Sequence, residues 1–149
     1  MSFVIDPEID LEIIITEQLE SVKVPNYAFI DGQNLYRGLE ELGYKLLYKE
    51  FIDYLKGKYK CKKVFIFFKE NQMFDGFYDQ IRAMGYSVIL SKSHNRVNNF
   101  TKSNIDGDLI VKAMRSYYEV ENHNLILLTG DGDFLPLVNF MKRKHILFR

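Results

Sequence analysis

This chain has little cysteine, no long apolar run and no net charge. Each of these features limits the classes of protein to which the chain can belong. Cys61 is the single cysteine, so no disulfide can form within the chain, and we expect a reducing compartment, the cytoplasm. No apolar run approaches the ~20 residues that a membrane-spanning helix needs, so we expect no membrane partner. The acidic residues 1–10 lack the basic and then apolar order of a signal peptide.

The formal net charge is +0, but it is unevenly distributed. Residues 1–26 hold six acidic side chains against Lys23 alone, which leaves the remainder mildly basic and gives weak support for a polyanionic partner. Residues 8–22 place apolar side chains at helical spacing. We therefore expect residues 1–26 to form an acidic helical arm that shields a basic groove or mediates homodimerisation, and residues 27–149 to form the main domain.

From residue 27 onward, strand-like runs alternate with helix-like ones. Apolar runs predict strands at 27–30, 63–68, 86–90, 125–128 and 145–148. Helical periodicity predicts helices at 34–42, 48–59, 74–84, 105–118 and 134–144. This alternation is typical of βαβ units and predicts an α/β fold with a central parallel sheet. Residues 91–104 show no clear period and predict a polar loop.

Acidic side chains follow two of the predicted strands. Asp31 ends the first strand, and Asp131 and Asp133 follow the fourth. If the strand order is 3-2-1-4-5, as assumed by analogy with other open sheets, the first and fourth strands are neighbours where the winding direction reverses. Asp31 and Asp131 would then lie side by side. Clustered carboxylates repel each other unless a cation lies among them, so the pattern indicates a metal-dependent hydrolase.

The residues of the late segment differ in their expected roles. Asp131 is the expected direct metal ligand, because it ends the strand and the glycines on either side permit a sharp turn. Asp133 precedes a Phe-Leu-Pro sequence that can open a helix, so it is either an N-cap or a water-mediated outer ligand. Thr129 either donates to a carboxylate or phosphate, or caps the turn.

Helical geometry separates two further acids at the start of the helix predicted over 105–118. Asp106 shares the apolar face of Leu109 and Ala113, so it points inward, which is costly unless something pairs with it. Asp108 shares the polar face of Lys112 and is expected to pair with it across one helical turn. Asp106 is therefore the expected site residue of the two.

Amide and basic side chains complete the candidate site. Asn34 follows Asp31 by three residues and either caps the first helix, orients Asp31 or contacts a phosphate. The loop 91–104 carries Arg96 and Lys102 among amides and one aromatic, a composition that suits single-stranded nucleic acid as well as an ordinary solvated loop. Lys102 either contacts a phosphate or is an ordinary exposed lysine. Most tyrosines and phenylalanines are expected in the core.

Three segments together resemble a known family: residues 29–35 (FIDGQNL), 102–108 (KSNIDGD) and 128–134 (LTGDGDF). They are similar, in order and spacing, to the NYN family, the LabA-like branch of the PIN-like nucleases, over residues 27–148. The resemblance implies a PIN-like Rossmannoid three-layer sandwich with the strand order 3-2-1-4-5, and a divalent-metal site acting on RNA. Asp31, Asp106 and Asp131 would match the metal-binding acids, and Asn34 and Asp133 the other recurring polar positions.

The leading hypothesis is an Mg²⁺- or Mn²⁺-dependent ribonuclease that uses Asp31, Asp106 and Asp131. Hard oxygen ligands suit these ions, which activate water and neutralise phosphodiester charge without a serine, cysteine or histidine nucleophile. One alternative is an RNA-binding or regulatory protein with little turnover. Another is a phosphatase of the haloacid dehalogenase type, which needs a second acid where this chain has Gln33.

Overall fold

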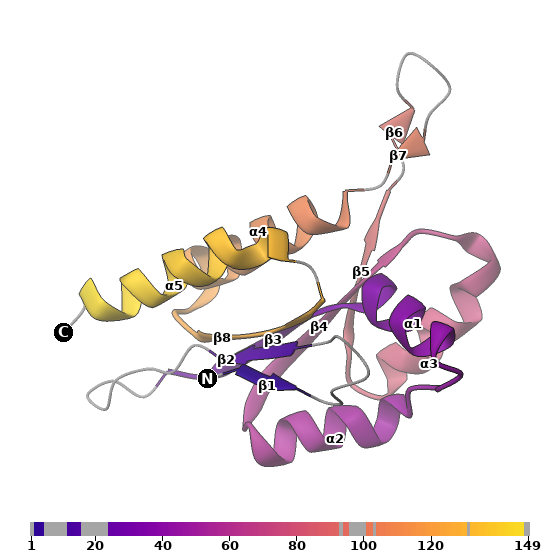
Figure 1. Cartoon of the computed structure of the whole chain (residues 1–149), viewed down its shortest axis with the longest axis horizontal. Coiled ribbons are helices and arrows are strands. Elements are labelled where there is room, and N and C mark those ends of the chain that lie inside the picture. Colours follow the sequence, from indigo (N-terminus) through magenta and orange to yellow (C-terminus); the bar gives the residue numbers. More distant parts are fainter. Residues whose placement is uncertain are drawn as a thin grey trace.

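The computed structural model describes residues 2–4, 12–15, 24–92, 94–95, 101–102, 104–130 and 132–147, and the side chains within 24–92, 104–130 and 132–143. A central six-stranded sheet has the order β1-β2-β8-β3-β4-β5 (Figure 1). Its strands are β1 (Ser2–Val4), β2 (Glu12–Ile15), β3 (Asn26–Asp31), β4 (Cys61–Lys69), β5 (Ser87–Ser91) and β8 (Asn124–Thr129). The helices are α1 (Gly32–Glu41), α2 (Tyr48–Lys58), α3 (Asp75–Ala83), α4 (Ile105–Arg115) and α5 (Leu135–Leu147).

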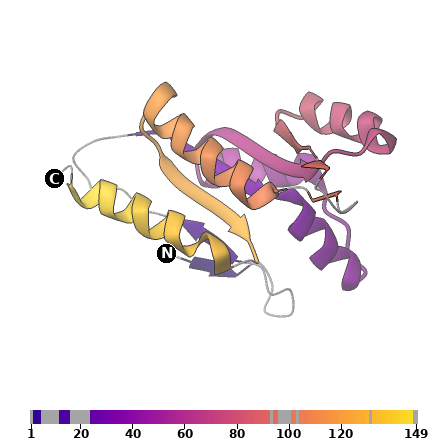
Figure 2. The same cartoon turned by 90° about the horizontal axis from the view of Figure 1, so that it is seen from above.

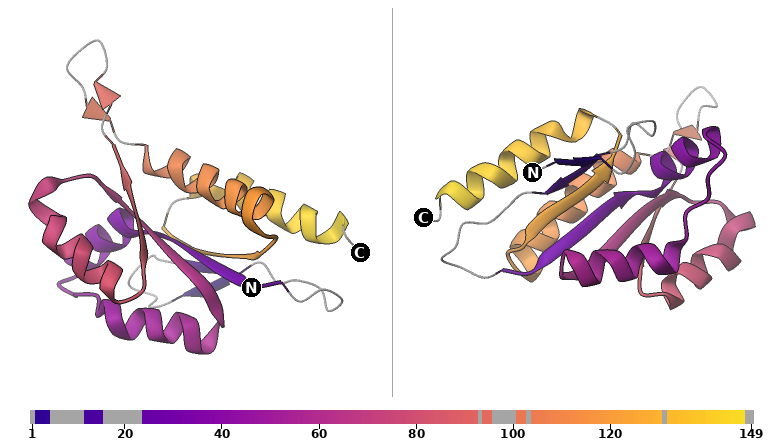
Figure 3. Two further views of the ribbon diagram at one scale, coloured as in Figure 1. Left: turned by 180° about the vertical axis from the view of Figure 1, so that it is seen from behind. Right: turned by 60° about the horizontal axis from the view of Figure 1, so that its bottom comes forward.

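Helices cover both faces of the sheet. Figures 1 and 3 show α4 and α5 on one face and α1, α2 and α3 on the other. Each face has its own core: Ile66 and Phe68 of β4 pack on the α1–α3 side, and Phe65 and Phe67 on the α4–α5 side. Because both faces are buried, β4 has a continuous apolar run instead of an alternating one. The structure confirms the predicted α/β sandwich.

The four central strands are parallel, and their order confirms most of the predicted topology. Strand β3 pairs with β4 on one side and with β8 on the other, and β4 pairs with β5. In the numbering of the predicted strands this is 3-2-1-4. The carboxyl ends of all four strands lie along one edge of the sheet. The first and fourth predicted strands are therefore neighbours, as the site hypothesis requires.

The predicted fifth strand at 145–148 is wrong, because α5 continues through Leu147. Leu137, Val138 and Met141 are buried at helical spacing against the sheet, which holds this segment in one long helix. The edge of β8 that a fifth strand would have used is occupied by β2, which pairs with it antiparallel. The last position of the order 3-2-1-4-5 thus belongs to a strand from the start of the chain.

The helix predicted over residues 8–22 is wrong for Glu12–Ile15, which form β2. This segment contains three consecutive isoleucines, and β-branched side chains favour extended backbone over helix. Pairing with β8 holds these residues in the sheet, whereas a short isolated helix would have no such partner. It also covers the edge of β8 that would otherwise be open. Residues 5–11 and 16–23 lie outside the described residues, and the division at residue 26 stays a prediction.

The polar loop predicted over 91–104 contains a short two-stranded antiparallel sheet. Strand β6 (His94–Asn95) pairs with β7 (Thr101–Lys102), with His94 opposite Lys102. This hairpin stands away from the main sheet beyond the carboxyl end of β5 (Figure 1). Within the described part of the chain, the helices are too short or too polar for one of them to traverse a lipid bilayer.

Candidate active site at the carboxyl edge of the sheet

Two buried polar residues end neighbouring strands. Asp31 ends β3 and Thr129 ends β8, with 5% and 4% of their surfaces exposed. Side chains alternate between the faces of a strand, and Phe29 and Leu127, two residues earlier, both lie in the core beneath α4 and α5. The alternation therefore assigns Asp31 and Thr129 to the face that α4 covers.

Asp31 is also the N-cap of α1. The backbone N–H of Asn34 donates to Asp31 Oδ1, with an N···O distance of 3.1 Å. The positive end of the helix dipole stabilises a carboxylate at this position. The cap holds the side chain in a defined orientation, and its second oxygen is not needed for that bond, so capping and ligand binding are compatible roles.

Gly32 permits a close approach between this turn and the neighbouring strand β4. A Cβ atom added at Gly32 would lie 2.8 Å from the backbone oxygen of Phe67 and 2.7 Å from Cε1 of Phe68. Asp31 is paired with Phe67 in the β3–β4 register. The glycine after Asp31 thus allows the strand to turn into α1 while its end stays packed against β4.

Asn34 links α1 to the loop after β8. Its Oδ1 accepts a hydrogen bond from the backbone N–H of Gly130 at 3.0 Å, between residues 96 apart in sequence. Asn34 is not the cap of the first helix, because Asp31 has that role. The Asn34 side chain instead fixes the residue that immediately precedes Asp131, and Asp131 itself lies outside the described residues.

Asp106 is half-buried in the first turn of α4, which packs against β3 and β4. Asn104 caps this helix: its Oδ1 accepts from the backbone N–H of Gly107 at 2.9 Å. A Cβ atom at Gly107 would lie 2.6 Å from the Asn104 side chain. The glycine between the two acids is therefore explained by the close approach of the cap.

The predicted pairing of Asp108 with Lys112 is wrong. Asp108 accepts a hydrogen bond from the hydroxyl of Ser91, the buried last residue of β5, while Lys112 Nζ lies 5.2 Å from the centroid of the Phe65 ring. This bond docks the first turn of α4 over the end of β5. Residues 106 and 108 are about 200° apart around a helix, so the Asp106 side chain leaves α4 on a different side from that of Asp108.

The donor chemistry fits a hard divalent cation, although the described residues do not complete a site. Asp31 and Asp106 offer carboxylate oxygens, the ligands that Mg²⁺ and Mn²⁺ prefer. Within residues 24–92, 104–130 and 132–143, no three histidine, cysteine or acidic side chains gather closely enough to hold an ion. Asp133 is exposed in the 3-10 turn Gly132–Phe134, which contacts α4. Asp131, the predicted third ligand, lies outside the described residues, so its role stays a prediction.

The remaining predicted RNA contacts are Arg96, Lys102 and Thr129. Arg96 lies outside the described residues, and Lys102 ends β7, where only the backbone is described. Figure 2, seen from above, shows the hairpin next to the start of α4. Contacts of Arg96, Lys102 and Thr129 with RNA stay predictions.

Cys61 and His123, the cysteine and the histidine whose side chains the structure describes, lie away from this edge. Cys61 is buried at the start of β4, and burial raises the pKa of its thiol to about 12, so the thiol is not a nucleophile at neutral pH. His123 is fully buried before the start of β8, with its ring stacked on Tyr27 at 4.3 Å. The carboxyl edge therefore offers carboxylate, hydroxyl and amide chemistry.

The expectation that the aromatic residues are mostly core missed a feature beside Asp31. Tyr36 on α1 and Phe74 before α3 each expose 49% of their surface, and both line a hollow of about 440 Å³ that reaches Gln33. Ser91 was missed as well. For Tyr36, the sequence signal was its position among Gln33, Arg37 and Glu40 on the polar side of α1, whereas Phe74 precedes α3 and has no such signal.

A family comparison identifies the domain. A model of the NYN domain family matches residues 27–148, which include all five helices and the four parallel strands except Asn26, the first residue of β3. Searches of curated proteins and of solved structures return no match to this chain. NYN domains are PIN-like nucleases, a group that generally uses divalent metal ions. With this match over most of its length, and with acids at the strand ends where the fold forms its sites, the chain belongs to the NYN domain family.

Proposed function

We propose that this protein is a ribonuclease that hydrolyses RNA phosphodiester bonds and depends on Mg²⁺ or Mn²⁺. The observation that carries the proposal is the buried carboxylate of Asp31 at the end of β3, next to a β8 loop that Asn34 ties to the same helix turn. Asp31, Asp106 and Asp131 would hold the ion, with Asp133 as an outer ligand. A bound ion would supply an activated water and positive charge against the phosphodiester.

The residues of the chain would contribute position and charge. Asp31 is held by its cap bond, and Asp106 by the docking of α4 on Ser91. The Thr129 hydroxyl can donate to a phosphate oxygen or a carboxylate, and Arg96 and Lys102 can contact the RNA backbone. Phosphate contacts of this kind bind nucleic acid without reading its sequence. A single strand is the expected substrate, because its backbone can bend toward a narrow edge of the sheet.

Purified protein is expected to cleave labelled single-stranded RNA in Mn²⁺ or Mg²⁺ and to lose that activity in EDTA, by a factor of at least ~10². Excess Mn²⁺ should restore the activity, because the ion can return to the carboxylates once the chelator is saturated. Gel electrophoresis of an end-labelled oligonucleotide measures the rate. Undiminished cleavage in EDTA contradicts the proposal.

The second candidate is an RNA-binding regulatory protein with little turnover. RNA binding without metal-dependent cleavage in the same assay supports this candidate over the nuclease.

Replacing Asn34 with alanine is expected to slow cleavage by roughly 10- to 100-fold, the usual cost of losing a group that orients a metal ligand. The change removes the acceptor for the Gly130 N–H, so the segment that leads into Asp131 loses its tie to α1. Single-turnover cleavage and thermal unfolding should be measured together.

Asn124→Ala is the matched control for this variant. Asn124 Nδ2 donates to Asn26 Oδ1 at 2.9 Å at the opposite, amino ends of the same two strands. Both variants lose one side-chain hydrogen bond, worth about 0.5–1.5 kcal/mol of stability. Only Asn34→Ala should slow cleavage. Equal rates for the two variants would show that Asn34 does not position the site.

A further inference from the structure

A concave aromatic surface lies next to the candidate active site. The hollow of about 440 Å³ is walled by α1, the end of β4 and the start of α3. Its aromatic lining is Tyr36, Phe68, Phe74, Phe77 and Tyr78. This volume is in the range of small-ligand sites, which are mostly apolar with a few polar groups.

Buried rings form the floor of this aromatic hollow, and half-exposed rings form its mouth. Phe68 and Tyr78 are buried, and the Phe68 ring packs edge-on against Phe77 with centroids 5.8 Å apart. At the mouth, Tyr36 and Phe74 each leave about half of their surface in water. Two half-exposed rings on a rigid aromatic floor form a platform on which a flat ring can stack.

The hollow is continuous with the turn that carries Asp31. Gln33, two residues after Asp31, lines it, and the Phe68 ring of its floor lies where a Cβ of Gly32 would be. The hollow lies on the α1–α3 side of the sheet, and the Asp31 side chain is assigned to the α4 side, so the two meet across the first turn of α1 at the carboxyl edge. An RNA strand whose phosphate lies at Asp31 would have to cross this turn to place a neighbouring unit in the hollow.

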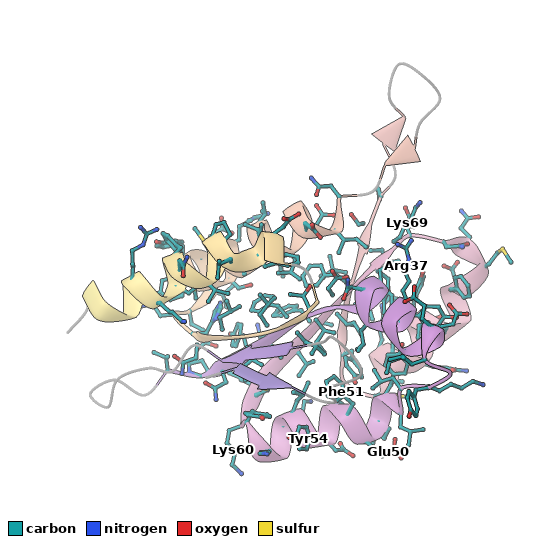
Figure 4. All side chains as sticks on the ribbon, in the orientation of Figure 1. Arg37, Glu50, Phe51, Tyr54, Lys60 and Lys69 are labelled. Carbon is teal, nitrogen blue, oxygen red and sulfur yellow. The ribbon has the colours of Figure 1, made fainter. Side chains whose placement is uncertain are left out.

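The polar rim suits a nucleobase attached to phosphate. Lys69 lines the mouth, and Figure 4 shows Arg37 and Lys69 at the same corner of the molecule. Cations there can contact the sugar-phosphate backbone. Gln33, Glu70 and Asn71 supply amide and carboxylate groups that can hydrogen-bond the edges of a base. Glu70 also makes the rim less basic, which favours a base with an exocyclic amino group over a bare phosphate.

We propose that the aromatic hollow binds one unpaired nucleobase of the RNA, next to the phosphodiester at the carboxyl edge. This inference rests on the proposed function and adds to it a binding site for one base of the single-stranded substrate. A paired base has its faces stacked on its neighbours and its edge hydrogen-bonded, so it cannot enter the hollow. Tyr36 and Phe77 also line a second hollow of about 330 Å³, so the two hollows adjoin at these rings.

The test uses the full chain in EDTA, so that binding is measured without cleavage. The probe is a set of short single-stranded RNAs that carry 2-aminopurine at one position each, whose fluorescence is quenched by stacking. One position should be quenched by the wild type and not by Tyr36→Ala or Phe74→Ala. Each alanine variant should lose ~5- to 100-fold in affinity. Tyr36→Phe keeps the ring and should bind like the wild type.

Two matched controls distinguish the loss of a ring that lines the hollow from the loss of any exposed side chain. Met73→Ala removes a side chain that is 88% exposed next to Phe74 but does not line the hollow. Tyr118→Ala removes a tyrosine that is 55% exposed in the π-helical turn Ser116–Val120, which follows α4. Both should bind RNA like the wild type. If Tyr36→Ala unfolds, Phe74→Ala and the wild-type quenching pattern still test the proposal.

The outcomes distinguish the two proposals. Unchanged affinity of both alanine variants, no quenched position, or equal affinity for single-stranded and duplex RNA of one sequence overturns the base site, even where wild-type cleavage stands. Position-specific quenching that is lost in the variants, without metal-dependent cleavage, supports the base site and overturns the nuclease. A wild type that neither binds nor cleaves RNA overturns both.

Discussion

Replacing Asp31 with asparagine is expected to reduce metal-dependent RNA cleavage on the order of 10²- to 10³-fold and to leave the fold intact. Asparagine has nearly the same shape and keeps an Oδ1 acceptor for the Asn34 N–H, so the cap of α1 survives. What is lost is one negative charge on a buried side chain at the sheet edge. Removing a group that stabilises transition-state charge has an effect of this size.

Cleavage rates in Mn²⁺ and far-ultraviolet circular dichroism during thermal unfolding measure the two halves of this prediction. Asp53→Asn is the control, because it removes the same charge from an exposed aspartate on α2 that pairs with Lys49. The control should cleave at the wild-type rate. Full activity of the Asp31→Asn protein would exclude Asp31 from the metal site, and a large fall in its unfolding temperature would make the loss of activity structural.

Gly32→Ala is expected to destabilise the protein by about 1–3 kcal/mol, the usual cost of forcing extra volume into a packed site. The added methyl group would lie 2.8 Å from the backbone oxygen of Phe67 and 2.7 Å from the Phe68 ring. The ring can rotate, but the carbonyl belongs to a central strand and cannot move without disturbing its pairing. Chemical denaturation, with the slope checked for constancy, gives the free energy of unfolding.

Gly132→Ala is the matched control, because a Cβ there would meet no described atom within 4 Å. Its free energy of unfolding should stay within about 0.5 kcal/mol of the wild type. Gly32→Ala should also slow cleavage, because the displaced turn carries Asp31. A Gly32→Ala protein as stable as the wild type would mean that the turn and β4 are not in close contact.

The elements of the central domain were predictable from residue patterns, because both faces of the sheet are covered. Continuous apolar runs such as Val64–Phe68 occur where a strand is buried on both sides, and each helix has one apolar stripe. Patterns of this kind are local, and they predicted four strands and five helices. They failed for Glu12–Ile15 and His145–Leu147, where the outcome depends on which segment pairs with the free edge of β8.

The candidate site was likewise predictable only in part from the sequence. That Asp31 ends a strand is visible in the sequence. The order of the four parallel strands agrees with the order expected from other open sheets. The partners of Asn34 and Asp108 were not predictable, since Gly130 and Ser91 come from other parts of the chain. The aromatic hollow joins α1, β4 and α3, and no periodicity within one segment reports such a surface.

The sequence alone determined the strand and helix types of the main domain and the acidic character of the residues after two strands. It did so because side-chain spacing decides which face of an element can be buried. Only the tertiary structure decided that β2 closes the edge of β8, that Asn34 ties the β8 loop to α1, and that half-exposed rings surround a hollow beside Asp31. These depend on contacts between distant segments, which form only when the sheet brings those segments together.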